Sequence, residues 1–313
     1  MPSATPAIQT DALCKHWGAV RANDEVTLEV APGEVFGYLG PNGAGKTTTL
    51  RLLLDLLRPT SGSAFVLGED VRAAGARLRR QVGYLPGEMY LWRRMDADAT
   101  FRLMDRLRGG GGEHLARARQ LASRLRLSPT SSVGRMSKGN RQKVGLCLAF
   151  MHEPQVLVLD EPTSGLDPLM QAEFHAMVDE ARSRGATALV SSHVLAEVEQ
   201  VADRVGIIRQ GRIVTVDSVS GLKERAPRRV RLRLGTGAAA AAVASELDAL
   251  DGVDAVAAGP GDPPGSLRFL VRGGIDGFVK VIARHEVADL EVHEADLESI
   301  FLDHYRDQPG GGA

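Results

Sequence analysis

The sequence predicts an α/β domain followed by a smaller α+β domain, and three observations support this fold class. From about residue 6 to 222, short apolar runs alternate with amphipathic stretches, as strands and helices do in α/β domains. A glycine-rich loop near residue 40 separates one apolar run from one helical run. After residue 226 the runs follow the order βαββαβ, which is typical of a ferredoxin-like α+β domain.

The first domain is expected to contain a buried parallel sheet. Residues 35–39, 156–159 and 187–190 are short, continuous apolar runs, as in strands that are buried on both faces. Residues 47–57 carry leucines at helical spacing, and Pro59 ends that helix. The other elements expected here are a helical segment over residues 91–151, broken by four glycines at 109–112, and a hairpin of residues 205–208 and 212–216.

The second domain is expected to begin after Arg225, so that residues 1–225 and 226–313 form the two domains. It contains no group of residues with evident chemistry, which favours a regulatory or packing role. Its strands are expected at residues 230–234, 253–257, 267–271 and 290–293, and its helices at 238–250, 276–285 and 297–305.

Composition excludes several classes of protein. The 313 residues carry 38 basic and 39 acidic side chains, so no global field attracts nucleic acid, and no nucleic-acid partner is expected. No stretch approaches the ~20 apolar residues that span a bilayer, and the first residues lack the pattern of a signal peptide. The only cysteines, Cys14 and Cys147, fit a disulfide-free cytosolic protein, with Cys147 as a buried thiol. Any role at a membrane would therefore depend on a partner.

The glycine-rich loop matches the phosphate-binding motif GxxxxGK[ST] at every position. Its backbone N–H groups and the start of the following helix are expected to surround phosphates. Lys46 is expected to reach the β- and γ-phosphates of a nucleotide, and the hydroxyl of Thr47 to bind Mg²⁺. The residues expected to bind the nucleotide here are Gly40, Pro41, Asn42, Gly43, Ala44, Gly45, Lys46, Thr47 and Thr48.

Two carboxylates follow a second buried strand. Asp160 ends the apolar run at 156–159 and is expected to hold Mg²⁺ together with Thr47. Glu161 comes next and points to the opposite side of the strand, where it can orient and deprotonate an attacking water. These two residues favour ATP hydrolysis over transfer of the phosphoryl group to another substrate.

At this point the chain resembles the ATP-binding-cassette (ABC) family. The segment Met136-Ser-Lys-Gly-Asn140 resembles the family signature, usually LSGGQ, and opens a predicted helix. The resemblance implies a P-loop nucleotide-binding domain with a helical subdomain. It also implies that Ser137 and Gly139 bind the γ-phosphate held by a second subunit, in a head-to-tail dimer with two ATP molecules between the subunits. Lys138 departs from the usual glycine, and its side chain either adds a phosphate contact or points to solvent.

Three further residues have roles that the resemblance implies. Asp167 lies in Ser164-Gly-Leu-Asp-Pro, which resembles the D-loop that carries signals across the dimer. His193 resembles the switch histidine that contacts the γ-phosphate. Trp17 lies where the family places an aromatic ring that stacks on adenine, and the alternative is an ordinary core tryptophan.

One motif departs from the family pattern. The family usually has Gln after Gly-Tyr-Leu-Pro, where it touches Mg²⁺ and the membrane partner. Here Pro86 is followed by Gly87 and Glu88. Two alternatives remain: Glu88 replaces the Gln as a metal ligand, or a water molecule fills that place.

The resemblance implies an ATP-hydrolysing subunit that uses ATP and Mg²⁺. Residues 84–88, 137–143 and 296–302 resemble the drug- and antibiotic-export branch. The expected partners are a second copy or a paralogous ATPase subunit and a separate transmembrane permease, which would hold the protein at the cytoplasmic face of the membrane. The alternative is a soluble ABC ATPase acting on ribosomes or DNA. Such relatives usually carry two cassettes, coiled-coil insertions or zinc-binding cysteines, and this chain has one cassette and two isolated cysteines. A nutrient-importer ATPase is a third possibility, but its C-terminal domain tends to be an all-β barrel.

Overall fold

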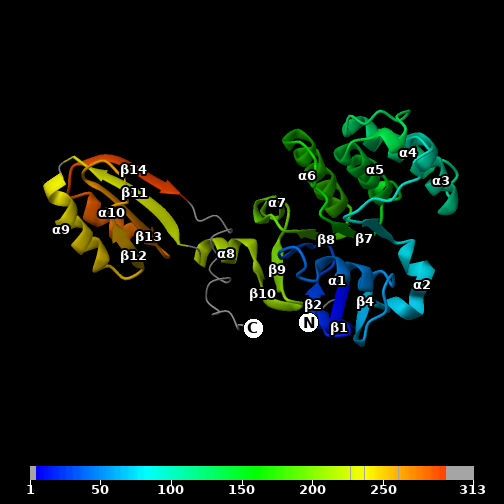
Figure 1. Ribbon diagram of the computed structural model, residues 1–313, viewed down its shortest axis with the longest axis horizontal. Helices are drawn as coiled ribbons and strands as arrows, with labels where there is room; N and C mark the ends of the chain where they lie inside the picture. The colour runs from blue at the N-terminus through cyan, green and yellow to red at the C-terminus, as the bar shows by residue number, and fades with distance from the viewer. Residues whose placement is uncertain (1–4, 226, 236, 260, 294–313) are drawn as a thin grey trace. The chain divides into compact units, whose positions relative to one another are not determined.

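The computed structural model describes residues 5–225, 227–235, 237–259 and 261–293 of the chain (Figure 1). The chain forms two compact units, Met1–Ser218 and Val219–Ala313. The sequence predicts the boundary after Arg225, and the observed division lies a few residues earlier. We call the first unit the cassette and the second the C-terminal domain.

A six-stranded sheet in the order β10-β9-β3-β8-β7-β6 forms the centre of the cassette. Neighbouring strands from β9 to β6 run parallel, and β10 pairs antiparallel with β9. The expected buried parallel strands and the hairpin are therefore confirmed. The strands are β3 (Val35–Leu39), β6 (Val82–Leu85), β7 (Val156–Asp160), β8 (Thr187–Ser192), β9 (Arg204–Arg209) and β10 (Arg212–Ser218).

Both faces of this sheet are covered, which explains the apolar character of its strands. In β7, Val156 and Val158 pack with α1 and an antiparallel sheet, whereas Leu157 and Leu159 pack with helices of the opposite layer. The sequence did not reveal the antiparallel sheet, which has the order β2-β1-β4-β5. These elements are β1 (Ile8–Trp17), β2 (Val20–Val30), β4 (Ser61–Val66), β5 (Glu69–Asp70) and α1 (Lys46–Leu53), which ends four residues before the expected position.

Three helices, α3, α4 and α5, pack together as a helical subdomain, as the sequence predicts (Figure 1). The glycines at 109–112 form the turn between α3 and α4. Among the described residues, no helix is both long enough and apolar enough to cross a lipid bilayer. After α1, the helices described in the cassette are α2 (Val71–Arg79), α3 (Ala97–Leu107), α4 (Glu113–Arg124), α5 (Lys138–Phe150), α6 (Pro168–Ser183) and α7 (Leu195–Glu199), with a 3₁₀ turn at Val133–Arg135.

The C-terminal domain has the expected βαββαβ order. Its four strands form an antiparallel sheet in the order β12-β13-β11-β14, the ferredoxin-like arrangement of two interleaved βαβ units. A separate apolar core, with Phe269 and Phe278 in edge-to-face contact, lies between the sheet and α9 and α10. The elements are α8 (Val219–Arg225), β11 (Arg228–Leu234), α9 (Gly237–Asp248), β12 (Val253–Ala257), β13 (Ser266–Val271), α10 (Asp276–Ile282) and β14 (Val287–His293). The helix expected at residues 297–305 lies outside the described residues.

Candidate functional site

The order of the central strands brings the predicted site residues together. β8 lies between β3 and β7, and all three strands are parallel, so their carboxyl ends meet at one edge of the sheet. The glycine-rich loop follows β3, Asp160 ends β7, and His193 follows β8. Residues that are more than a hundred positions apart in the sequence therefore share one site.

The glycine-rich loop needs its glycines for steric reasons. Gly45 has φ +111°, and a Cβ atom added there would lie 2.2 Å from the carbonyl oxygen of Ala22. A Cβ at Gly40 would lie 2.4 Å from the carbonyl oxygen of Ile208. The loop thus packs directly on neighbouring backbone, and α1 begins at Lys46 immediately after it. This is the arrangement in which backbone N–H groups and a helix start can bind phosphate.

Lys46 is a buried cation at the centre of this loop. Its side chain is only 6% exposed, and its Nζ donates hydrogen bonds to the carbonyl oxygens of Gly40 (2.5 Å) and Pro41 (3.3 Å). Its Nζ also lies 3.3 Å from Oε1 of Glu161. The burial of an ammonium group is costly unless it has partners. Here the loop carbonyls and the carboxylate hold the charge at a fixed position.

Asp160, the last residue of β7, connects the start of α1 to the neighbouring strand β8. The carboxylate is 1% exposed; Oδ2 accepts a hydrogen bond from the Thr47 hydroxyl (2.7 Å) and Oδ1 accepts one from the Ser191 hydroxyl (2.5 Å). Thr47 and Asp160 therefore place a hydroxyl and a carboxylate side by side. Oxygen ligands of this type are those that Mg²⁺ prefers.

Glu161 contacts both Lys46 and His193. Its Oε2 lies 2.7 Å from Nδ1 of His193. The backbone of Glu161 has φ +51°, a left-handed conformation that a residue with a side chain rarely adopts. The backbone N–H donates to the Ser191 hydroxyl (3.1 Å), and the Gln142 amide donates to the Glu161 carbonyl (3.0 Å), which together hold this conformation. Strain of this kind is concentrated at functional sites.

Sequence reasoning did not single out Ser191 or Gln142 as site residues. Both are buried and polar, and both hold the backbone or side chain of a predicted site residue. Ser191 is the register partner of Asp160 in the adjacent strand, a relation that only the sheet order reveals. Gln142 has a sequence signal, since it lies two residues after the signature-like segment, with Arg141 between them.

The signature-like segment lies against the turn that follows β7. Ser137 is the N-cap of α5, and its Oγ accepts a hydrogen bond from the Asn140 backbone N–H (3.2 Å). A Cβ at Gly139 would lie 2.3 Å from the Gly165 carbonyl oxygen, so glycine is required for this contact. Within the described part of the chain, neither Ser137 nor Gly139 hydrogen-bonds to the loop at residues 40–48. Lys138 is exposed, and its Nζ donates a hydrogen bond to the Ser164 hydroxyl (2.7 Å).

Asp167 caps the next helix along the chain. Its Oδ1 accepts a hydrogen bond from the Met170 backbone N–H (3.0 Å), which explains why α6 begins at Pro168.

Trp17 ends β1 and is 48% exposed, with Nζ of Lys15 5.3 Å from its ring centroid. The alternative of a core tryptophan is therefore wrong, and the ring is accessible to a ligand.

Glu88 as a metal ligand stays a prediction, and the structure shows its side chain in contact with Tyr90. Its Oε2 accepts a hydrogen bond from the hydroxyl of the exposed Tyr90 (2.8 Å), and this bond raises the pKa of Tyr90. The residue beside Asp160 is Gly87, where an added Cβ would lie 3.1 Å from Oδ2 of Asp160. A glycine therefore lies next to the carboxylate of Asp160.

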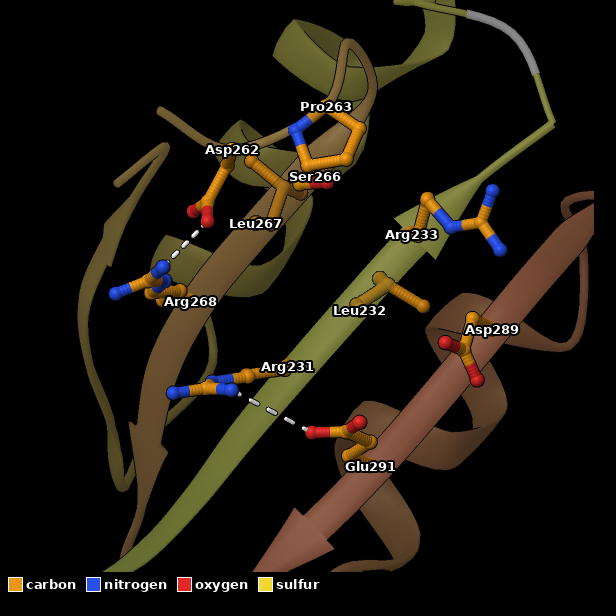
Figure 2. A pocket seen from close by; sticks show the side chains of 10 residues that line it. All are labelled: Arg231, Leu232, Arg233, Asp262, Pro263, Ser266, Leu267, Arg268, Asp289 and Glu291. Carbon is orange, nitrogen blue, oxygen red and sulfur yellow. Dashed lines mark hydrogen bonds and ion pairs between the residues drawn. The ribbon is translucent and has the colours of Figure 1, made fainter. Parts of the chain in front are cut away.

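The C-terminal domain carries charges of a different kind. The charged face is the side of its sheet opposite to α9 and α10, and Figure 2 shows Arg231 directed to Glu291 and Arg268 to Asp262 around a shallow cavity of about 190 Å³. Arg231 is 61% exposed, and its pair with Glu291 spans 3.7 Å. The residues lining the cavity are Arg231, Leu232, Arg233, Asp262, Pro263, Ser266, Leu267, Arg268, Asp289 and Glu291.

Comparison with known proteins identifies the family. Residues 23–164 match the family model described as ABC transporter. The bacitracin transport ATP-binding protein BcrA of Bacillus licheniformis is 33% identical over 219 residues, which cover 70% of this chain and 72% of that protein. The daunorubicin resistance ATP-binding protein DrrA3 of Streptomyces coeruleorubidus is 38% identical over 223 residues, which cover 70% of this chain and 71% of that protein.

A longer relative and two solved structures also match ATP-binding parts of ABC transporters. The probable multidrug ABC transporter ATP-binding protein YbhF of Escherichia coli is 34% identical, and the match covers 69% of this chain but only 38% of YbhF. A solved ATP-binding subunit of an ABC transporter is 30% identical with a TM-score of 0.65, and the match covers 70% of this chain and 92% of that structure. The dimeric structure of a bacterial ABC transporter cassette shares the fold, with 20% identity and a TM-score of 0.63 over 68% of this chain and 98% of that one. The chain therefore belongs to the ABC transporter family, among its ATP-binding proteins.

Proposed function

We propose that the chain is the ATP-binding and ATP-hydrolysing subunit of an ABC exporter that works with a separate transmembrane permease. The observation that carries this proposal is the convergence of Lys46, Asp160 and Glu161 at the carboxyl ends of β3 and β7, which lie on either side of β8. A cation, a carboxylate and a second carboxylate at this edge of the sheet are the groups that phosphate binding, metal binding and water activation require.

The phosphates of ATP bind in the loop at residues 40–48, with their charge facing the loop N–H groups and Nζ of Lys46. The ammonium group is already fixed by two carbonyl oxygens, so little reorganisation is needed when a phosphate approaches. At the opposite end of the nucleotide, the half-exposed ring of Trp17 stacks on adenine.

Thr47 and Asp160 would hold Mg²⁺, because they offer adjacent hydroxyl and carboxylate oxygens. The lack of a side chain at Gly87 leaves space beside Oδ2 of Asp160. The ion would neutralise part of the charge on the phosphate oxygens. Ser191 keeps Asp160 in place through Oδ1, so that Oδ2 faces Thr47.

Glu161 acts as the general base that accepts a proton from the attacking water. Its left-handed backbone conformation and the hydrogen bonds from Ser191 and Gln142 fix its direction. His193 lies against the second carboxylate oxygen of Glu161 and contacts the γ-phosphate through its ring. The roles of binding, orientation and proton transfer are thus divided among separate residues.

Two cassettes form a head-to-tail dimer, either of two copies of this chain or with a paralogous subunit. In this dimer Ser137 and Gly139 of one subunit bind the γ-phosphate in the loop of the other, and Asp167 lies at the contact between subunits. The start of α5, capped by Ser137, presents backbone N–H groups suited to an anion. The dimeric cassette of the same fold supports this arrangement.

The transport function rests on the relatives. Proteins named for bacitracin transport, daunorubicin resistance and multidrug transport are 33–38% identical to this chain. We place the chain at the cytoplasmic face of the membrane, where a permease would convert closure and opening of the ATPase dimer into export. The C-terminal domain, residues 226–313 by the sequence and beginning at Val219 by the structure, has a regulatory or coupling role. No observation favours the alternative of a soluble ATPase acting on ribosomes or DNA.

Mixing two inactive variants tests the dimer. Lys46→Ala removes the phosphate contact of one subunit, and Ser137→Arg blocks the signature segment that serves the other. If each site uses both subunits, a mixed dimer contains one intact site, and the mixture should hydrolyse ATP when neither variant alone does so. The fraction of restored turnover is measured with the total protein concentration held constant. A mixture no more active than its components would contradict a shared site.

A further inference from the structure

Three side chains that the nucleotide site does not use converge near the turn of the β1–β2 hairpin. Cys14 and His16 lie two positions apart in β1, and Asp24 lies in β2. Their ligand atoms, Sγ, a ring nitrogen and a carboxylate oxygen, all lie within 4.8 Å of one another. Alternate residues of a strand point to the same side, which explains how Cys14 and His16 meet.

Irregular pairing brings Asp24 to the other two residues. The register between β1 and β2 shifts between Leu13 and Lys15 and again between Lys15 and His16. Glu25, next to Asp24, has φ +57°, so the strand bulges at this point. Bulges re-aim side chains, and here the bulge directs the carboxylate of Asp24 toward His16.

Two observations point to a ligand at the centre of this cluster. Nε2 of His16 is inaccessible to solvent and has no hydrogen-bond partner among the described residues, which is costly for a buried polar atom. The nearest carboxylate oxygen, Oδ1 of Asp24, lies 3.9 Å away, too far for a hydrogen bond. Two bonds of about 2.1 Å to one cation would span this separation.

The remaining contacts leave the three ligand atoms available. Asp24 uses Oδ2 for the guanidinium groups of Arg21 (3.2 Å) and Arg212 (2.9 Å), and Oδ1 faces His16. Sγ of Cys14 accepts a hydrogen bond from the Glu25 backbone N–H (3.2 Å), and the thiol donates weakly to the Ala12 carbonyl oxygen (3.5 Å).

We infer that Cys14, His16 and Asp24 form a binding site for a transition-metal dication of the Zn²⁺ type. One thiolate, one imidazole and one carboxylate are ligands that Zn²⁺ accepts, and small side-chain rotations would bring all three to bonding distance. Arg21 and Arg212 hold the carboxylate from behind, as outer partners of metal ligands do. Three protein ligands leave a fourth position for water. The metal would brace the hairpin that ends at Trp17 and Val20.

Cobalt(II) tests this inference directly, because a thiolate bound to Co²⁺ gives a charge-transfer absorption band in the near ultraviolet. The full chain, free of any histidine tag and kept reduced, is titrated with Co²⁺ and then with Zn²⁺. We expect one equivalent of Co²⁺ to produce the band and Zn²⁺ to remove it. The band should be absent in Cys14→Ser and intact in Cys147→Ala, because Cys147 is buried in α5 away from these ligands.

His16→Gln and Asp24→Asn provide a second measurement that does not depend on the thiol. Each should weaken Co²⁺ binding by at least the 10- to 100-fold that loss of an outer partner costs, while thermal melting without metal reports whether each variant folds. No band in the wild-type chain at saturating Co²⁺, a band that survives in Cys14→Ser, or unchanged affinity in folded His16→Gln would each overturn the inference.

Discussion

Two groups of charges in this protein each combine basic with acidic side chains, but one group is buried and the other is exposed. In the cassette, Lys46, Asp160 and Glu161 are largely buried at the end of the parallel sheet, and each contacts an element distant in sequence. On the charged face of the C-terminal domain, Arg231 and Glu291 are about half exposed and pair across neighbouring strands (Figure 2). Burial, and not charge, distinguishes the two groups.

The difference shows that the cassette bears the cost of removing charged groups from water, whereas the C-terminal domain does not. Removing charges from water costs several kcal/mol per ion, and this is repaid only by precise partners. Exposed pairs cost little and contribute roughly 0–1 kcal/mol. The cassette cluster is therefore retained for what its charges do, whereas the charged face needs no explanation beyond solubility and weak pairing. Substitutions in the two regions should have very different consequences.

The largest contrast is expected between two aspartates. Asp160→Asn should lower ATP turnover by about 10³-fold or more, because metal-ion stabilisation of transferred phosphate is worth several kcal/mol and about 1.4 kcal/mol corresponds to a factor of ten. Asp262→Asn, on the charged face, should leave turnover unchanged. Steady-state ATP hydrolysis at saturating Mg²⁺ measures both. Equal effects of the two substitutions would remove the distinction between the regions.

A buried histidine of the cassette provides the second contrast. Burial is the main cause that lowers the pKa of His152 to about 4, with Arg108 adding to it, and its Nε2 lies 3.2 Å from the Val82 carbonyl oxygen. A lowered folded-state pKa means that the unfolded chain binds the proton first. The stabilisation from the neutral His152 is therefore present above pH ~6.5 and is lost as the pH falls toward about 4. The free energy of unfolding lost in this way reaches about 2 kcal/mol by about pH 5.

Denaturant unfolding at several pH values tests this expectation. His152→Gln should be less pH-dependent than the wild type by about that amount between about pH 7 and 5. His293→Gln, an exposed residue next to Glu291, should follow the wild-type curve. Parallel curves for wild type and His152→Gln would show that this histidine does not titrate as its burial requires.

The smallest contrast compares two half-exposed tryptophans. Trp17→Ala should weaken ATP binding by ~1–3 kcal/mol if the indole stacks on adenine, and Trp17→Tyr should restore most of the loss. Trp92 has almost the same exposure as Trp17 but lies outside the site, so Trp92→Ala should leave the affinity unchanged. Nucleotide titration beside a thermal melt distinguishes stacking from damage to the fold. Weakening by Trp92→Ala of similar size would argue against stacking at Trp17.

Much of the architecture could be predicted from local patterns in the sequence. Apolar runs such as 156–159 indicated buried parallel strands, and the βαββαβ order indicated the ferredoxin-like sheet. The antiparallel sheet of β1, β2, β4 and β5 was not predicted, because its strands are half-buried and interrupted by bulges. Their pairing depends on partners as distant as Ile8 and Val66, which a local pattern does not contain.

The residues of the nucleotide site also fall into those that could be predicted from the sequence and those that could not. Residues within motifs, such as Lys46 and Asp160, could be identified because their spacing follows from phosphate chemistry. Ser191 could not, because its role depends on β8 lying next to β7. Glu88 as a metal ligand stays a prediction: its residue type suits a metal, and the residue that the structure shows beside Asp160 is Gly87. Cys14, His16 and Asp24 form a cluster only through the bulge in β2.

Turnover and binding measured together on Glu161→Gln test the central claim most directly. The amide keeps the size of the side chain and leaves Lys46 and the loop at residues 40–48 intact, so ATP should bind with nearly wild-type affinity. Hydrolysis should fall by at least the ~10²–10⁴ expected for loss of a general base. The matched control, Glu291→Gln on the charged face, should hydrolyse ATP at the wild-type rate. Wild-type turnover by Glu161→Gln would contradict the assignment of Glu161 as the base.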